Sequence, residues 1–271
     1  MADRYAVIGH PVAHSKSPWI HAEFARQTRQ DLDYARIEAP LDGFARAVDE
    51  FRAAGGSGAN ITLPFKEQAF LYCKDAVTDR ARAVGVVNTL VFDGGRAGGE
   101  ILGDNTDGAG LLRDLTVNLG CKLAGARVLL MGAGGAAQGV LAPLVGAGPR
   151  RLVIANRTAD KARALARRYG ASAGGGYEDL RGEQFDVLIN ATSAGLADEA
   201  PPLAAGQFAR GALAYDMVYG RDTPFLALAR AAGAAAHDGS GMLVEQAAES
   251  FFVWRGVRPD TAPVLAALRG R

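Results

Sequence analysis

One six-residue segment constrains the fold more than any other part of the chain. It lies between an uncharged apolar run at residues 127–131 and a helical pattern at residues 138–145. The segment consists of Gly132, Ala133, Gly134, Gly135, Ala136 and Ala137. The first glycine allows a tight turn, Gly134 lets backbone N–H groups approach a pyrophosphate, and Ala137 permits close packing of helix on strand. In this strand–turn–helix setting the pattern predicts a dinucleotide site.

The residues after the next expected strand, 151–155, bear on which dinucleotide is bound. An NAD site has an acidic residue there, about 20 residues after the glycine turn, to accept the ribose hydroxyls. This chain instead has Asn156, Arg157 and Thr158, followed one turn later by Lys161. Arginine can bind a 2′-phosphate, which a carboxylate would repel. We therefore expect NADP(H); the alternative is that Arg157 and Lys161 are only solvated charges.

The rest of the chain alternates short β-rich runs with amphipathic helical stretches, which predicts an α/β protein with a mainly parallel sheet in its first hundred residues. We expect a helix from Pro18 with Ser17 as its N-cap. Further strands are expected at residues 5–8, 34–38, 60–63, 185–191, 213–218 and 234–237, with a hairpin from 87–92 and 100–102. Further helices are expected at 41–54, 106–119, 160–169, 224–232, after 241 and at 263–268, and a loop at 174–176.

Composition excludes several classes of partner. The chain has 271 residues, a formal charge of +1 and 22% charged residues, which gives no indication of nucleic-acid or membrane binding. Charges near the N-terminus argue against a signal peptide, so a cytoplasmic protein is expected. Cys73 and Cys121 lack metal or redox spacing and are expected to be buried thiols, with no metal site. Only five of the 30 basic residues are lysines.

Four polar segments stand out in the first half of the chain. They are HSKSP at 14–18, NITLPFK at 60–66, NT at 88–89 and GDNTDG at 103–108. Each has a simple explanation when it is considered alone, as a helix cap, a turn, a loop or a surface lysine. Ahead of a dinucleotide turn, however, the four together resemble the shikimate dehydrogenase family. The resemblance extends over nearly the whole chain, through GHPVAHSKSP, ANITLPFK, AVGVVNT, LGDNTDG, GAGGAAQ, ANRT, INATS, YDMVY and GMLVEQAA.

The resemblance implies a role for each matching residue. Lys66 would be the acid–base residue and Asp107 its partner, and both would also contact the substrate. Ser15 and Ser17 would bind the substrate carboxylate near the start of a helix, where the dipole favours an anion. The substrate's ring hydroxyls would be bound by Asn60, Thr62, Asn88 and Gln246, and Tyr219 would join the carboxylate contacts. Thr192, Met217 and Gly241 would line the nicotinamide pocket, with simple packing as the alternative.

The resemblance also implies an organisation and a reaction. Because Gln246 follows the cofactor unit, we expect a substrate domain of residues 1–106 completed by helices in 241–271. A Rossmann-type NADP-binding domain would span 107–240, with a cleft between the two domains. The expected reaction is reversible NADPH-dependent reduction of 3-dehydroshikimate to shikimate, by a monomer or a homodimer. Two alternatives are a dual quinate/shikimate dehydrogenase and a catalytically silent NADPH-binding regulator.

Overall fold

The computed structural model describes residues 2–92, 100–192 and 198–270. The chain forms two compact units, one of residues 1–110 and 244–271 and the other of residues 111–243. The first unit is therefore built from two separate parts of the sequence. Each unit has its own sheet, and the two are described separately below.

The first unit contains a five-stranded mixed sheet. Its strands are β1 (Asp3–Gly9), β2 (Leu32–Glu38), β3 (Gly56–Ile61), β4 (Thr89–Phe92) and β5 (Ile101–Asp104). Their order is β2-β1-β3-β4-β5, in which β2, β1 and β3 are parallel and β4 is antiparallel to both β3 and β5. The expectation of a mainly parallel sheet was therefore wrong. The connection from β4 to β5 is too short for a parallel crossover, so these strands pair as a hairpin; the hairpin turn at 93–99 lies outside the described residues.

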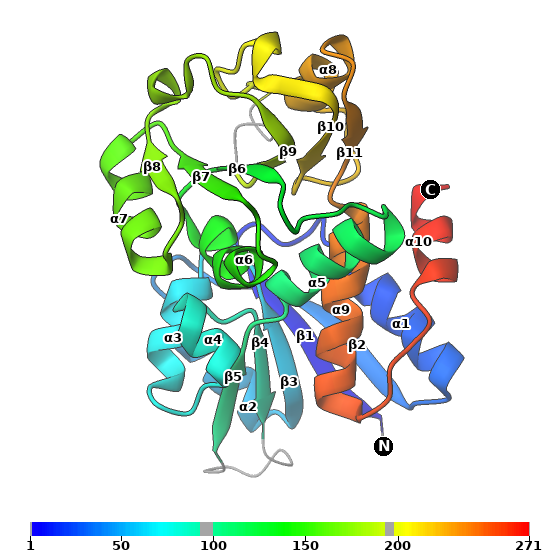
Figure 1. The fold of residues 1–271 in the computed structure, drawn as a ribbon. Coiled ribbons are helices and arrows are strands. Elements are labelled where there is room, and N and C mark those ends of the chain that lie inside the picture. Colours follow the sequence, from blue (N-terminus) through cyan, green and yellow to red (C-terminus); the bar gives the residue numbers. More distant parts are fainter. Residues whose placement is uncertain (1, 93–99, 193–197, 271) are drawn as a thin grey trace. The chain divides into compact units, whose positions relative to one another are not determined.

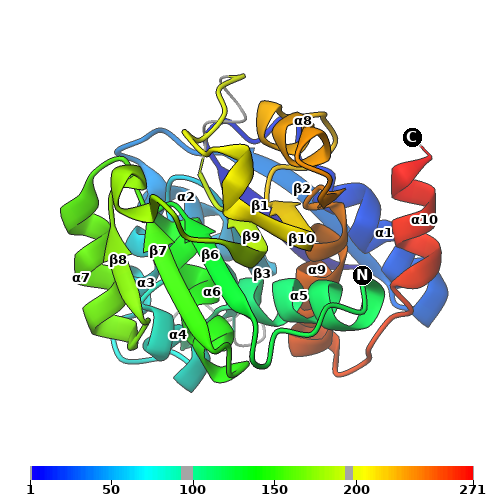
Figure 2. The ribbon, with the colours of Figure 1, turned by 45° about the horizontal axis from the view of Figure 1, so that its top comes forward.

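Helices pack on both faces of this sheet (Figure 1). They are α1 (Ser17–Thr28), α2 (Phe44–Ala53), α3 (Lys66–Cys73), α4 (Asp79–Val84) and α9 (Ser240–Arg255). Two further helices are α5 (Asp107–Arg113), which begins in this unit, and α10 (Ala262–Arg269). Buried side chains of α2, α3 and α4 form one apolar cluster with Ala6, Ile8 and Ala59 of the sheet. On the opposite face, Tyr5 of β1 stacks on Trp254 of α9 with ring centroids 4.5 Å apart. Figures 1 and 2 show α10 alongside α1, where the Asp260 N–H donates to Gln27 Oε1.

Two helix starts differ from the sequence expectation. Helix α1 begins at Ser17 itself and its N-cap is Lys16, so the assignment of Ser17 as N-cap was wrong by one residue. Pro18 still lies in the first turn, where its missing N–H costs nothing. Helix α2 begins at Phe44 rather than Leu41, because Leu41 is 61% exposed whereas Phe44, Val48 and Phe51 form the buried stripe.

The second unit contains a six-stranded, entirely parallel sheet of Rossmann type. Its strands are β6 (Arg127–Met131), β7 (Arg151–Ala155), β8 (Ala173–Gly175), β9 (Phe185–Asn190), β10 (Phe208–Asp216) and β11 (Ala235–His237). The order β11-β10-β9-β6-β7-β8 reverses direction at β6, which places a topological switch point between β6 and β9. Its helices include α6 (Gly135–Gly146), α7 (Ala159–Tyr169) and α8 (Pro224–Ala231).

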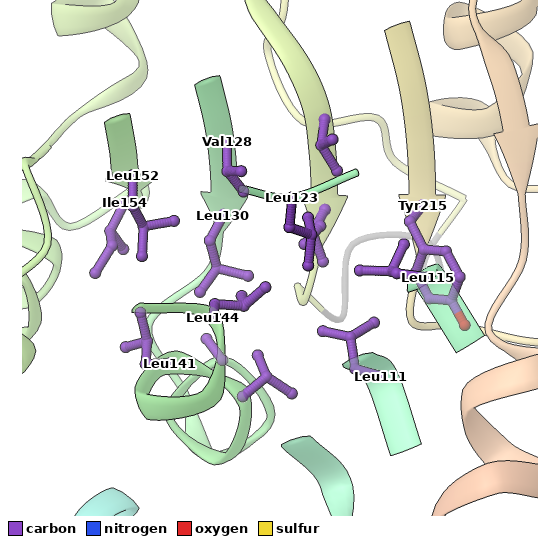
Figure 3. Packing of buried hydrophobic residues seen from close by; sticks show 14 of the residues in the cluster. Leu111, Leu115, Leu123, Val128, Leu130, Leu141, Leu144, Leu152, Ile154 and Tyr215 are labelled. Atoms are coloured by element: carbon purple, nitrogen blue, oxygen red, sulfur yellow. The ribbon is translucent and has the colours of Figure 1, made fainter. Parts of the chain in front are cut away.

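The core of this unit lies between the sheet and α6. Figure 3 shows Leu141 and Leu144 of α6 directed toward Leu130 and Ile154 of the strands, and all four are buried. A second apolar cluster, which includes Leu129, Val153 and Phe225, covers the other face. Strands β6, β7 and β9 are buried on both faces, which is why they appear in the sequence as nearly continuous apolar runs.

One expectation in this unit was wrong. The loop expected at residues 174–176 is in part strand β8, where a Cβ on Gly174 would stand 2.3 Å from the carbonyl oxygen of Ala162 in α7. The helix expected at about 106–119 is present as α5 at Asp107–Arg113, which continues as a π-helical turn at Asp114–Asn118. Within the described ranges, no helix is long and apolar enough to cross a membrane.

Candidate functional site

The first unit brings Lys66 and Asp107 into direct contact. Lys66 is the first residue of α3, after the turn at 63–65 that follows β3, and Asp107 is the first residue of α5. The Lys66 Nζ donates to Asp107 Oδ2 at 2.7 Å. The two side chains are only 13% and 5% exposed. An ion pair this well shielded from water is far less screened than a surface pair.

Asn88 holds the other oxygen of the same carboxylate. Its Nδ2 donates to Asp107 Oδ1 at 3.0 Å and to Thr106 Oγ1 at 2.9 Å. Its Oδ1 accepts from the Thr106 backbone N–H at 2.8 Å and from the Thr89 hydroxyl at 2.9 Å. An amide side chain offers two donors and two acceptor positions, so the protein itself already uses those of Asn88. The geometry makes Asn88 a support for Asp107.

Asn60 is tied into the same buried polar cluster. Its Nδ2 donates to Ser250 Oγ of α9 at 2.9 Å and to Thr89 Oγ1 at 3.2 Å. Its Oδ1 accepts from the Tyr34 hydroxyl at 2.7 Å. Both hydrogens of the amide are thus occupied, and only a lone pair on Oδ1 is left to accept a hydroxyl from a ligand. Burial raises the pKa of Tyr34 well above its usual value, which keeps this hydroxyl a donor.

Gln246 and Thr62 lie at the edges of this cluster. Asn88 Nδ2 is 3.3 Å from Gln246 Oε1. The close approach of α5 to α9 at this point depends on Gly110, where a Cβ would stand 2.6 Å from the Gln246 backbone nitrogen. Thr62 follows β3, and its Cγ2 would be 2.4 Å from a Cβ added at Gly9, so the segments after β1 and β3 run side by side.

A buried ion network fixes the loop that leads into α5. Asp104, 2% exposed, accepts from Arg80 of α4 at 2.6 and 2.5 Å and from the Thr78 hydroxyl. Burial alone would raise the pKa of Asp104, but the bonds from Arg80 and Thr78 outweigh it and lower that pKa. Arg80 also donates to Glu249 of α9. The residues just before Asp107 are therefore held by charged groups on two helices.

Ser15 and Ser17 form a pair at the start of α1. Both are nearly buried, at 6% and 5% exposure. The Ser15 hydroxyl donates to Ser17 Oγ at 3.2 Å and accepts from the Ser17 backbone N–H at 3.3 Å. The Ser15 carbonyl accepts two bonds from the Arg36 guanidinium. The structure places two hydroxyls, a helix N-terminus and a cation together.

In the second unit, the glycine turn has the geometry that a pyrophosphate needs. Gly132 adopts a φ of +113°, which favours glycine, and a Cβ there would stand 3.0 Å from the Ala191 carbonyl oxygen. Gly134 is the N-cap of α6, and among the described residues no atom lies within 4 Å of where its Cβ would be. The first N–H groups of α6 thus border open space that a side chain would otherwise fill. This space fits a dinucleotide phosphate.

The residues expected to choose the dinucleotide lie after β7. Arg157, Thr158 and Lys161 are exposed, and Thr158 is the N-cap of α7. The Asn156 side chain donates to the Thr158 carbonyl at 3.1 Å, which orders the turn. Within the described part of the chain, neither Arg157 nor Lys161 forms an ion pair with an acidic residue, so both charges are available to a phosphate.

Three expected pocket residues fall into two groups. Thr192 donates to Asn190 Oδ1 at 2.7 Å, and the Met217 N–H donates to the Asn190 carbonyl at 2.9 Å, so both lie at the ends of β9 and β10. A Cβ on Gly241 would stand 2.0 Å from Asp114 Oδ1, so this glycine allows Asp114 to approach α9. Tyr219 also lies in the second unit, within the segment between β10 and α8.

The described residues contain no group of three His, Cys, Asp or Glu side chains that could hold a metal ion. Burial raises the pKa of the Cys73 thiol to about 12, so that cysteine is unreactive. Cys121 is partly exposed rather than buried as expected.

Comparison with known proteins decides the family. Three family models match: the shikimate dehydrogenase substrate binding domain at residues 7–90, shikimate / quinate 5-dehydrogenase at 115–197, and the shikimate 5′-dehydrogenase C-terminal domain at 239–269. A shikimate dehydrogenase (NADP(+)) of Dechloromonas aromatica is 58% identical over 276 residues, covering 100% of this chain and 99% of the relative. The chain belongs to the shikimate dehydrogenase family.

Solved structures of known proteins share its fold. An Ael1 enzyme from Pseudomonas putida is 50% identical, with a TM-score of 0.89 and 98% of both chains covered. Shikimate 5-dehydrogenase from Thermus thermophilus, solved in complex with NADP(H) and shikimate, is 37% identical, with a TM-score of 0.87 and 99% of both chains covered. The expectations of an oxidoreductase and of NADP(H) as its cofactor are confirmed.

The structure adds site residues that the sequence reasoning missed. Tyr34, Thr89, Thr106 and Ser250 supply hydroxyls that fix the amides of the shikimate dehydrogenase motifs. Thr89 and Thr106 lie inside motifs that had been singled out, and Ser250 follows Gln246 by one helical turn. The sequence positions of these three residues could therefore have indicated that they belong to the site. Tyr34 had no such signal, because it lies in a strand with no polar motif.

Proposed function

We propose that the protein catalyses the reversible NADPH-dependent reduction of 3-dehydroshikimate to shikimate. The Lys66–Asp107 ion pair is the observation that carries this proposal within the family. The reaction adds hydride to the carbonyl carbon and a proton to the carbonyl oxygen. NADPH, when bound, supplies the hydride.

Lys66 is proposed to supply the proton. Its ammonium donates to the developing alkoxide, and in the oxidative direction the neutral amine takes the hydroxyl proton. Asp107 orients the lysine through Oδ2 and is itself held through Oδ1 by Asn88. An orienting carboxylate with both oxygens bonded cannot rotate freely, which keeps the lysine directed to one position.

The remaining residues are proposed to bind and orient the substrate and cofactor. Ser15 and Ser17 bind the substrate carboxylate, and Asn60 Oδ1 accepts a ring hydroxyl. Thr62, Gln246 and Tyr219 complete the substrate contacts. The turn at Gly132 to Ala136 binds the pyrophosphate, with Asn156, Arg157, Thr158 and Lys161 around the 2′-phosphate, and Thr192, Met217 and Gly241 near the nicotinamide.

The proposal assigns a role to each part of the chain. Residues 1–106 with 241–271 are proposed to form the substrate domain and residues 107–240 the NADP-binding domain, close to the two observed units of 1–110 with 244–271 and 111–243. The enzyme acts in the cytoplasm, in the pathway to aromatic amino acids. Support comes from the first unit, which holds Lys66, Asp107 and the Ser15–Ser17 pair, and from the second unit, which holds the glycine turn and Arg157; of the proposed substrate residues, Tyr219 alone lies in the second unit.

A two-by-two assay tests the proposed function. NADP⁺ or NAD⁺ is combined with shikimate or quinate, and formation of reduced cofactor is followed by absorbance. The expected result is fast reduction of NADP⁺ with shikimate and much slower reaction in the other three combinations. Comparable rates with quinate and NAD⁺ would indicate a dual quinate/shikimate dehydrogenase. Tight NADPH binding without turnover of either acid would indicate a regulator.

A further inference from the structure

The guanidinium of Arg36 is attached to the Ser15–Ser17 segment. Arg36 lies on β2, two residues after Tyr34 and therefore on the same face of the strand. Its Nε and Nη2 donate to the Ser15 carbonyl oxygen at 3.0 and 2.5 Å. The Ser15 peptide thus fixes the position of a charged group that would otherwise move freely.

The charge of Arg36 has no acidic partner in the part of the chain that the structure describes. Several other arginines form an ion pair with an acidic side chain, such as Arg26 with Glu23 and Arg127 with Asp186. The next acid on the same face of β2 is Glu38, whose carboxylate lies 3.5 Å from His10 Nδ1. The first turn of α1 also carries no acidic residue. An uncompensated cation therefore lies beside two buried hydroxyls.

We propose that Arg36 is a specificity residue for the carboxylate of the substrate. This inference rests on the proposed function, in which Ser15 and Ser17 bind that carboxylate. The two hydroxyls supply hydrogen bonds, which a neutral carboxamide could also accept. Arg36 supplies the positive charge, which favours only an anion. Its attachment to the Ser15 carbonyl keeps the charge in place before the substrate arrives, so little is lost in ordering it on binding.

A charge-selective role and a structural role of Arg36 predict different effects on the binding of acid and carboxamide ligands. If Arg36 only holds the Ser15 peptide, its loss should weaken acid and carboxamide ligands equally. If its charge matters, its loss should weaken binding of the acid and leave the carboxamide nearly unchanged. Salt should reduce the advantage of the acid in the wild-type protein, because mobile ions screen partly exposed charges.

The experiment compares shikimate with its carboxamide in four proteins. These are the wild type, Arg36→Gln, Arg36→Lys and the control Arg26→Gln, which removes the same charge from the far end of α1. KM and kcat with NADP⁺ are measured for shikimate, the inhibition constant is measured for the carboxamide, and both are repeated at low and high salt. Thermal melting of each variant establishes that it is folded.

The expected result is a rise in KM for shikimate of about five- to tenfold in Arg36→Gln, from the loss of one unit charge near the carboxylate in a solvated site. Its kcat and its affinity for the carboxamide should stay within about twofold of wild type, and the salt dependence of KM should largely disappear. Arg36→Lys should keep most of the selectivity, and Arg26→Gln should keep all of it. Equal weakening of acid and carboxamide, or no weakening, would overturn the inference alone. A wild-type protein that does not oxidise shikimate would overturn the proposed function as well.

Discussion

Replacing Asn88 with alanine should release Asp107 from the polar cluster behind it. In the native protein Asn88 donates to Asp107 Oδ1 at 3.0 Å and accepts from the Thr106 backbone N–H at 2.8 Å. Asn88 is 2% exposed and Thr106 is fully buried, so water does not easily replace either bond. Asp107 would keep only its bond to Lys66 among these side-chain partners.

The size of the effect follows from these two bonds. A buried N–H left without an acceptor costs about 1–3 kcal/mol, and a lost bond to a charged group costs about 1.5–3 kcal/mol. Some relaxation around the new cavity is expected, so we predict a loss of about 3 kcal/mol in the free energy of unfolding of the first unit. We also predict a fall in kcat of about 10- to 100-fold, because the carboxylate that orients Lys66 can then rotate.

Urea unfolding followed by tryptophan fluorescence measures the first effect. Both tryptophans, Trp19 and Trp254, belong to the first unit, so the signal reports that unit. The midpoint should fall by about 1–3 M urea, given the usual dependence of stability on denaturant. Asn118→Ala is a suitable control, since it removes an amide whose bond to Asp114 lies within the second unit, and it should leave this midpoint in place. An Asn88→Ala protein with an unchanged midpoint and unchanged kcat would refute the role of Asn88 as a support for Asp107.

Three further predictions concern other parts of the molecule. Arg157→Ala should raise the KM for NADP⁺ far more than the KM for NAD⁺, because the lost contact is to the 2′-phosphate. Equal effects on both KM values would show that Arg157 only supports the fold or stacks on the adenine ring. Replacing both Ser15 and Ser17 with alanine should weaken shikimate binding by about 1–3 kcal/mol while NADP⁺ affinity hardly changes, and normal shikimate affinity would exclude the carboxylate role. Burial lowers the pKa of His21 to about 3, so the unfolded chain binds one more proton than the folded chain between pH 6.5 and 3. Stability should therefore fall with acid across that window by about 1.4 kcal/mol per pH unit, and His21→Gln should remove that part of the dependence in urea titrations.

The sequence predicts the second unit more closely than the first, for a physical reason. The predicted ranges of β6 and β7 coincide with the observed strands, because a parallel strand buried on both faces is a continuous apolar run. Strand β8 contains only Ala173, Gly174 and Gly175 and has no such run. Its glycines are there because α7 packs against the backbone, and no pattern of side chains reveals that contact.

The site could be predicted only where its residues are grouped in the sequence. Lys66 and Asp107 lie in dense polar segments, and the structure brings their side chains together. Tyr34 and Ser250 are far from those segments and reach Asn60 from β2 and α9. The return of the C-terminal helix to the first sheet was expected from Gln246, but the pairing of Tyr34 and Ser250 with Asn60 depends on the register of β2 and α9, which no local pattern specifies. The expectation that Asn88 binds a ring hydroxyl stays a prediction; the structure adds its bonds to Asp107 and Thr106, which no sequence pattern indicates.

The central claim is that Lys66 carries the proton of the reaction, and Lys66→Arg tests it most directly. A chain with 25 arginines and five lysines has a lysine at this position, and only lysine can lose its proton at an accessible pH. The turnover of Lys66→Arg and of Lys66→Ala is measured with shikimate and NADP⁺ as a function of pH, with NADP⁺ binding as a check on the fold. The account predicts that both variants bind NADP⁺ normally and lose about 10²–10⁴-fold in kcat, the usual contribution of one general acid–base group. A Lys66→Arg enzyme with near-normal turnover and an unchanged pH profile would contradict it, because Lys66 would then act only as a fixed charge.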